Sequence, residues 1–182
     1  PNLTVLRPAD ANETIAAYRY AVSRSKGPIA MILSRQGLPI LEGTKEKATE
    51  SVARGAYILS DTDGTPDLLL IASGSEVSLA LSAKQKLETK GRRIRVISMP
   101  SWELFEQQPQ EYKDKVLPPD VKARVAIEMA HPLGWERYVG DKGKVLGITR
   151  FGASAPGTKL MEEYGFTPEH VVAIAEKVIA TS

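Results

Sequence analysis

Short apolar runs alternate with amphipathic and polar stretches along the 182 residues of the chain. The apolar runs predict β-strands over residues 3–6, 29–33, 56–60, 68–72, 93–99, 123–128 and 145–148. Helical spacing and helix-start signals predict α-helices over residues 11–25, 76–90, 102–107, 111–117, 134–139, 157–164 and 168–180. Strands that alternate with helices indicate an α/β fold, with helices on both faces of a sheet.

The first predicted helix carries a clear start signal. Asp10 is placed as its N-cap and Glu13 follows three residues later, which is the pattern of a capping box. Ile15, Tyr18 and Val22 fall on one face of this helix. With a strand on either side, residues 3–33 form a β-α-β unit, which is expected to be right-handed with parallel strands.

Residues 37–54 interrupt this alternation. The segment is polar after Leu41, contains two glycines and shows no sustained helical stripe. It is long for a loop within one domain. We therefore expect a linker here, with a domain boundary near residues 42–51.

Composition and charge exclude several classes of function. The 24 basic and 22 acidic residues give a formal net charge of +2, without the basic stripe of a nucleic-acid-binding protein. The absence of cysteine excludes disulfides, a thiol nucleophile and zinc sites built on thiolates, and it fits a reducing compartment. The sequence contains no apolar stretch near the roughly 18 residues that a membrane span needs. Because the first residue is Pro1, we expect the chain to start inside a longer protein, so missing targeting signals carry no information.

An arginine follows the strand predicted over residues 29–33, in the stretch MILSRQG (31–37). Open α/β folds place their ligands at the carboxyl edge of the sheet, and a guanidinium group binds phosphate in a bidentate fashion. Arg35 is therefore the best candidate for an anion site. The alternative is a solvated charge at the point where the chain reaches the surface.

The turn Ser73-Gly74-Ser75 follows a strand and opens a helix, where backbone N–H groups can hold a phosphate. It matches neither GxGxxG nor GxxxxGK[ST]. A tight turn at Gly74 and a plain N-cap at Ser75 explain the same residues.

The two histidines are separate in the sequence and do not form a metal site. His131 follows a predicted buried strand and could act as a general base. A single histidine before a proline is more often a loop residue with satisfied hydrogen bonds. His170 lies in the first turn of the last helix and is expected to be solvated.

Three further features have competing interpretations. The segment TRFGASAPG (149–157) could contact a ligand or a partner chain, although a tight strand-to-helix connection is the simpler interpretation. Trp102 and Trp135 lie on short predicted helices and are expected to anchor the core or an interface.

Five segments together carry a resemblance to a known family. They are LRPADANE (6–13), SRQGLPILEG (34–43), LLIASGSEVSLA (69–80), SMPSWELFEQQ (98–108) and RFGASAPG (150–157). In this order and spacing they resemble the carboxyl-terminal part of the transketolases, over residues 2–182.

The resemblance implies a domain organisation. Transketolases have three α/β domains per subunit, so residues 1–45 would be the last β-α-β unit of the pyrimidine-binding domain. Residues 46–54 would be a linker and residues 55–182 the C-terminal domain. That domain is expected to be Rossmann-like, with a mixed, mostly parallel sheet of about five strands flanked by helices.

The resemblance also implies a function for the full-length enzyme. Transketolases move a two-carbon ketol unit between sugar phosphates, in the pentose phosphate pathway and the Calvin cycle, with thiamine diphosphate and Mg²⁺ or Ca²⁺ as cofactors. Arg35 matches the family arginine that binds the terminal phosphate of the substrate. The cofactor and metal motif, the catalytic glutamate and the channel histidines lie upstream of Pro1 in the family. No catalytic, cofactor-binding or metal-binding residue is therefore assigned to this segment, and the isolated chain is expected to be inactive.

The implied partners are sugar phosphates, a second subunit in a homodimer whose interface this segment helps to pack, and the preceding part of the same enzyme. No nucleic acid or membrane partner is expected. The expected localisation is cytoplasmic, with a plastid as the alternative.

Two alternative functions stay open. One is an anion-binding regulatory or assembly module that uses the turn at residues 73–76. The other is the C-terminal domain of a related thiamine-diphosphate enzyme such as deoxyxylulose-phosphate synthase.

Overall fold

A two-stranded and a five-stranded sheet organise the chain in the computed structural model, which describes residues 2–24 and 26–182. β1 (Thr4–Leu6) and β2 (Ile29–Met31) pair in parallel and enclose α1 (Ala11–Ser23). The predicted β-α-β unit is therefore present. Its predicted helix end at Ser25 lies outside the described residues.

The five-stranded sheet has the order β3-β5-β4-β6-β7. Its strands are β3 (Tyr57–Ser60), β4 (Leu68–Ala72), β5 (Ile94–Ser98), β6 (Arg124–Ile127) and β7 (Lys144–Leu146). β3 runs antiparallel to β5, and the other neighbours pair in parallel. The expected mixed, mostly parallel sheet is confirmed. β4 is buried along its whole length, as a continuous apolar run in a central parallel strand requires.

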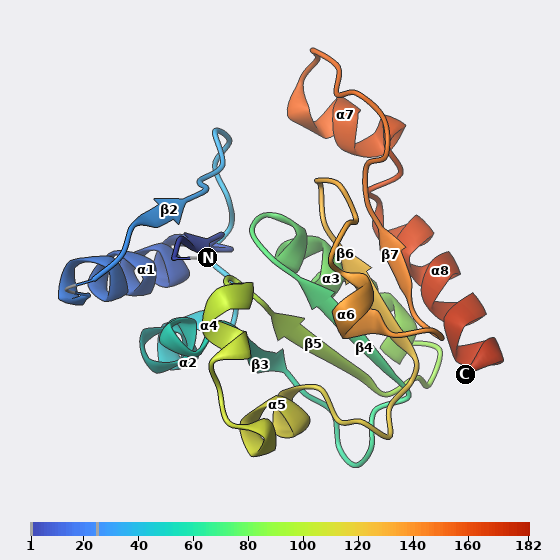
Figure 1. Cartoon of the computed structure of the whole chain (residues 1–182). Helices are drawn as coiled ribbons and strands as arrows, with labels where there is room; N and C mark the ends of the chain where they lie inside the picture. Colours follow the sequence, from blue (N-terminus) through green and yellow to red (C-terminus); the bar gives the residue numbers. More distant parts are fainter. Residues whose placement is uncertain (1, 25) are drawn as a thin grey trace.

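Helices cover both faces of this sheet (Figure 1). α3 (Glu76–Glu88) and α8 (Pro168–Thr181) pack against one face, where they meet Leu68 and Leu70 of β4. α4 (Trp102–Glu106), α5 (Gln110–Val116) and α6 (Glu136–Val139) lie on the other face with Leu69 and Ile71. Alternate residues of β4 thus enter opposite halves of the core.

α7 (Gly157–Glu163) follows β7 and precedes α8 along the chain, and it extends away from the sheet (Figure 1). None of its residues is buried, and residues 149–159 are all exposed. The tight strand-to-helix connection expected at residues 149–157 is therefore wrong. Small residues and a proline fill this stretch, so it has few apolar side chains with which to pack against the sheet.

α1 begins at its predicted N-cap. Asp10 has an extended backbone and its carboxylate accepts the Glu13 N–H at 2.9 Å. The face with Ile15, Tyr18 and Val22 is turned outward, with exposed fractions of 52, 50 and 82%. The buried residues of α1 are Glu13 and the small residues Ala16 and Ala17.

The expected linker contains a helix. α2 (Thr44–Ser51) and the 3₁₀ helix η1 (Val52–Arg54) occupy this segment. Thr44, Ala48 and Val52 are buried at a spacing of four residues, and Ala48 and Val52 pack with small residues of α1. A stripe of small residues suffices because the two helices lie close together, and this hides the helix from a search for large apolar side chains. The domain limits at residues 45 and 55 stay a prediction.

A buried carboxylate joins α1 to the larger sheet. Glu13 is 0% exposed, and its side chain accepts hydrogen bonds from the Tyr57 hydroxyl at 2.7 Å, the Ser98 hydroxyl at 2.6 Å and the Ala9 N–H at 2.7 Å. Burial raises the pKa of the Glu13 carboxyl above its usual range, against the effect of these hydrogen bonds. Segments far apart in the sequence are thereby held at one point.

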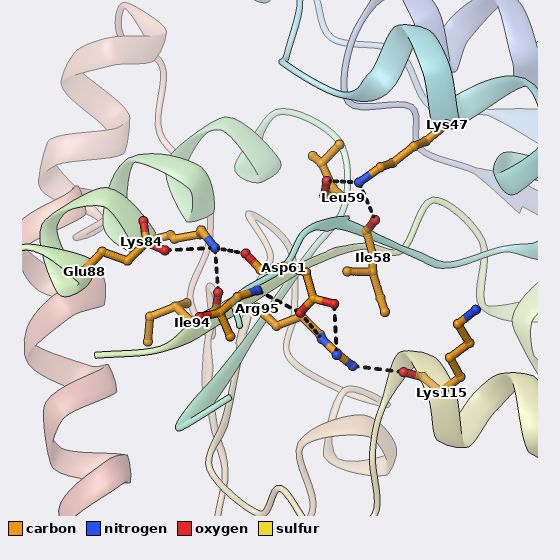
Figure 2. A network of polar contacts seen from close by, with 10 residues as sticks. Lys47, Ile58, Leu59, Asp61, Lys84, Glu88, Ile94, Arg95 and Lys115 are labelled. Atoms are coloured by element: carbon orange, nitrogen blue, oxygen red, sulfur yellow. Dashed lines mark hydrogen bonds and ion pairs between the residues drawn. The ribbon is translucent and has the colours of Figure 1, made fainter. Parts of the chain in front are cut away.

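Charged side chains secure the edge strand β3, where the pairing register shifts between Ile58 and Ser60. Figure 2 shows Lys47 donating to the carbonyls of Ile58 and Leu59, at 3.3 and 2.7 Å. On the opposite side, Lys84 donates to the carbonyls of Asp61 and Ile94 at 2.6 and 2.7 Å. The Lys47 ammonium group thus satisfies the Ile58 and Leu59 carbonyls within the irregular stretch of β3. The Lys84 ammonium group satisfies two carbonyls beside it.

Among the described residues, no helix is both long and apolar enough to cross a bilayer.

The contact between Gly55 and α4 gives a test of the fold. Gly55 has φ +83°, and a Cβ there would lie 2.2 Å from the Phe105 nitrogen and 2.3 Å from the Ser101 oxygen. Gly91 has φ +77° with open space around it. We expect Gly91→Ala to lower the free energy of unfolding by about 1–2 kcal/mol through backbone strain alone. Gly55→Ala should lower it by roughly 4 kcal/mol or more, because α4 must also move.

Urea unfolding of the two variants and the parent chain measures this difference. Equal losses for Gly55→Ala and Gly91→Ala would show that the packing of α4 against Gly55 is not a constraint on the fold.

Candidate functional site

The Arg35 loop, defined here as residues 32–40, follows the carboxyl end of β2. Arg35 lies four residues beyond Met31, the last residue of that strand, and its side chain is exposed. The Ser34 hydroxyl donates to the Gln36 carbonyl at 3.0 Å. Within the described part of the chain, the Arg35 guanidinium has no ion-pair or hydrogen-bond partner. Its donors are thus available to an anion.

Both ends of the Arg35 loop are fixed by hydrogen bonds. The Ile32 N–H donates to the Leu6 carbonyl of β1 at 2.8 Å and extends the parallel pairing by one residue. The Leu41 N–H donates to the Asp10 carboxylate at 2.9 Å, and Leu41 is buried. Between these points the chain is mostly exposed.

A second candidate region is the crevice at the carboxyl edge of the five-stranded sheet. The helix after β4 lies on one face, whereas those after β5 and β6 lie on the other. Crevices at such a switch are the usual ligand position of open α/β sheets. Here a cavity of about 270 Å³ is bounded by the strand ends, β1, and the two tryptophans. The lining residues used below are Arg7, Ser73, Trp102, Glu128, His131 and Trp135.

Arg7 extends from the end of β1 into this crevice. Its guanidinium pairs with Glu128, which follows β6, and with Glu76 of α3 at 3.2 Å. The Ser73 hydroxyl also donates to Glu128, at 2.7 Å. The position where a ligand would meet the sheet is therefore filled in part by the chain's own arginine.

Glu128 is 4% exposed, and burial raises the pKa of its carboxyl to about 7. The positive charge of Arg7 opposes this shift, while the negative charge of Glu76 adds to it. The carboxyl therefore changes its protonation near neutrality.

The turn at residues 73–76 does not present a free phosphate cradle. Gly74 has φ +57° and its N–H donates to the Arg7 carbonyl at 3.0 Å, so the predicted tight turn is confirmed. Ser75 makes no side-chain capping hydrogen bond, against the plain N-cap interpretation. The buried Glu76 carboxylate accepts from the Met129 N–H at 3.0 Å and from Arg7. A carboxylate of the chain itself thus lies at this helix start.

The histidines lie where the simpler interpretations placed them. His131 is exposed, and its Nδ1 accepts the Leu133 N–H at 3.1 Å. His170 is exposed on α8, with Nδ1 2.8 Å from the Gly165 carbonyl oxygen.

The two tryptophans belong to one aromatic cluster. Trp135 is 1% exposed and packs edge-on against Trp102, with ring centroids 5.0 Å apart. Tyr138 packs against both rings. The prediction that the tryptophans anchor the core is confirmed, and the same rings form part of the cavity wall.

The arrangement of these groups limits the chemistry of the site. In residues 2–24 and 26–182, the structure contains no group of three or more histidine or carboxylate side chains that could hold a metal ion. The buried carboxylates already accept hydrogen bonds from the chain. These carboxylates therefore do not fit a site for a divalent cation. The free guanidinium of Arg35 fits an anionic ligand.

Sequence reasoning missed the polar contacts of Arg7, Asp10, Glu13 and Glu128. Arg7 and Glu128 each follow a strand directly, a signal similar to the one that identified Arg35 shortly after an apolar run. Their pairing spans 121 positions, however, and no local pattern reports it.

The raised pKa of Glu128 predicts a pH dependence of stability. Between pH 4.5, the usual carboxyl pKa, and about pH 7, Glu128 is protonated in the folded chain but ionised in the unfolded chain. The contribution of Glu128 to the free energy of unfolding therefore falls as the pH rises through that range. Glu128→Gln cannot ionise. The free energy of unfolding of this variant, relative to that of the parent, should rise by up to roughly 3 kcal/mol between pH 5 and pH 8.

Urea unfolding at both pH values gives this difference, with Glu163→Gln as an exposed control. A gap between Glu128→Gln and the parent that stays constant with pH would contradict the assignment.

Comparison with known proteins identifies the family. Residues 55–167 match the model of the transketolase-like C-terminal domain. The transketolase of Halalkalibacterium halodurans is 55% identical over 98% of this chain, which covers 27% of that relative. The structure of transketolase from Leishmania mexicana superposes with a TM-score of 0.91 at 39% identity, over 99% of this chain and 26% of that one. Transketolase from Pichia stipitis in complex with sedoheptulose-7-phosphate superposes with a TM-score of 0.89 at 38% identity, over 99% of this chain and 25% of that one.

The chain thus spans about a quarter of the length of the relatives it matches. The matched domain, the high identity over nearly the whole chain and the shared fold agree with one another. The chain belongs to the transketolase family and corresponds to its carboxyl-terminal segment.

Proposed function

We propose that this chain works as the carboxyl-terminal segment of a transketolase, which transfers a two-carbon ketol unit between sugar phosphates. Arg35 is its substrate-binding residue and holds the terminal phosphate of the sugar. The observation that carries the proposal is the free, exposed guanidinium at the carboxyl end of a parallel strand. A relative of the same fold has been solved with a sugar phosphate, which supports this class of ligand.

The residues of this segment bind and position substrate in the proposed enzyme. The planar guanidinium of Arg35 can donate two parallel hydrogen bonds to phosphate oxygens, and its charge opposes that of the phosphate. Thiamine diphosphate supplies the chemistry of ketol transfer when it is bound. We assign it and its metal ion to the other three quarters of the enzyme. Among the described residues, no group of three or more histidine or carboxylate side chains could hold a metal ion.

Apolar side chains around the Arg35 loop support its place at a covered surface. Ile32, Leu33 and Ile40 are 50, 50 and 69% exposed in this chain. The outward face of α1 adds Tyr18 and Val22. An apolar surface of this kind marks a contact with another protein surface. We propose that the preceding part of the enzyme covers it, and that the segment alone is inactive.

The role of Arg35 is tested in a chimera that joins the preceding part of the Halalkalibacterium halodurans transketolase to this segment. We expect Arg35→Ala to raise KM for a phosphorylated ketose roughly 10- to 100-fold, because a charged hydrogen-bonded pair is lost. An unphosphorylated ketose should be affected little. Steady-state kinetics with both donors measures the contrast, with the exposed Arg92→Ala as control.

An equal effect of Arg35→Ala on both donors would assign Arg35 a structural role. The proposed phosphate site would then be wrong.

The covered surface is tested by mixing the segment with the separately expressed preceding part. We expect ketol transfer to appear only in the mixture. Val22→Asp should lower the recovered activity about 10-fold or more, since a buried unpaired charge is costly. Leu133→Asp, at a residue 75% exposed in the C-terminal domain, is the matched control.

Full recovery with Val22→Asp would show that α1 is not the docking face. Activity of the segment alone would contradict the proposed division of the enzyme.

A further inference from the structure

Asp10 makes contacts that exceed those of a helix cap. One carboxylate oxygen, Oδ1, accepts the Glu13 N–H at 2.9 Å and caps α1. The other, Oδ2, accepts the Leu41 N–H at 2.9 Å and lies 2.6 Å from the Thr44 hydroxyl. Asp10 is 3% exposed. Serine or asparagine would cap the helix as well as aspartate does, so the second oxygen needs a separate explanation.

The Leu41 N–H marks the end of the Arg35 loop. Ahead of it, residues 32–40 are held mainly by the β1 pairing at Ile32 and by the internal contact of Ser34. Beyond it, Thr44 starts α2, and its hydroxyl also accepts from the Asn12 amide at 2.9 Å. One buried carboxylate therefore fixes the returning end of the loop and the start of the next helix.

The position of Asp10 itself is set by the larger sheet. Glu13, one turn further along α1, is bonded to Tyr57 of β3 and Ser98 of β5. Arg7, three residues before Asp10, is bonded to the Pro100 carbonyl through its N–H at 2.8 Å. The connection from β1 to α1 is thus anchored on both sides of Asp10. Because Leu41 is bonded to Asp10, the returning end of the Arg35 loop is held at the same place.

We propose that Asp10 is a positioning residue for substrate binding, because it fixes the returning end of the Arg35 loop through its second carboxylate oxygen. The proposal rests on the phosphate-binding role of Arg35. Asp10 touches no substrate in this proposal, yet it contributes to the preference for phosphorylated over unphosphorylated sugars. A loop fixed at both ends holds its guanidinium near the bound position, so less order has to be gained when the phosphate binds.

The key variant is Asp10→Ser, which keeps an oxygen for the helix cap and removes the one that holds Leu41. Asp10→Asn is the second variant, because one amide cannot accept from both the Glu13 and the Leu41 N–H groups. Thr167→Ala is the matched control. It removes the N-cap hydroxyl of α8, which accepts the His170 N–H at 3.3 Å, and leaves the Arg35 loop untouched.

Hydrogen exchange of the segment tests the anchor without any activity. We expect Asp10→Ser to speed exchange of the Leu41 amide, and trypsin cleavage after Arg35, about 10-fold or more. The Glu13 amide should stay protected. Thr167→Ala should change neither. An unchanged Leu41 amide in both Asp10 variants would overturn the anchor.

Kinetics of the chimera tests the consequence for substrate. Asp10→Ser should raise KM for the phosphorylated ketose about 10-fold and leave kcat with the unphosphorylated ketose unchanged. In an Arg35→Ala background the same substitution should have no further effect on KM, since it acts through Arg35.

The two proposals fail in different ways. Arg35→Ala without donor discrimination refutes the phosphate site itself. In the other case, Arg35→Ala affects only the phosphorylated donor, but Asp10→Ser raises KM further in the Arg35→Ala background or affects both donors equally. That result overturns the positioning role of Asp10 and leaves the phosphate site in place.

Discussion

The buried carboxylate of Glu13 is the constraint on which the arrangement of this segment depends. A carboxylate without solvent is tolerated only when its oxygens are satisfied. Its donors are Ala9, just before its own helix, Tyr57 of β3 and Ser98 of β5. These hydrogen bonds hold the β-α-β unit against the larger sheet.

The two-stranded sheet depends on these contacts with the larger sheet. β1 and β2 have three paired positions, too few to define a stable sheet alone. Glu13 and Arg7 hold this separate two-stranded sheet against the carboxyl edge of the five-stranded sheet. The crevice that commonly receives a ligand in such sheets receives Arg7 here. At this edge the five-stranded sheet thus holds the β-α-β unit through Arg7.

The sequence predicted most of the sheet because its strands are continuous apolar runs. Leu68–Ala72 has no polar residue and could lie only in the middle of a sheet. α2 escaped prediction because its buried stripe is made of small residues that satisfy no amphipathic pattern. Residues 149–157 were expected to connect tightly, yet their one large apolar side chain is Phe151, which is 99% exposed. Local patterns report side-chain size and spacing. The predictions for α2 and for residues 149–157 failed because they depend on which other part of the chain each segment packs against.

The candidate site divides along the same line. Arg35 could be found because a charge close behind an apolar run, here residues 29–33, is a local signal. The contacts that hold its loop could not, because Asp10 and Leu41 are 31 positions apart and the capping pattern already accounted for Asp10. A capping aspartate has a second oxygen that the pattern leaves unassigned. In this chain that oxygen joins the start of α1, the end of the exposed loop and the start of α2. The order of the exposed arginine therefore derives from a buried acid that sequence alone identified only as a helix cap.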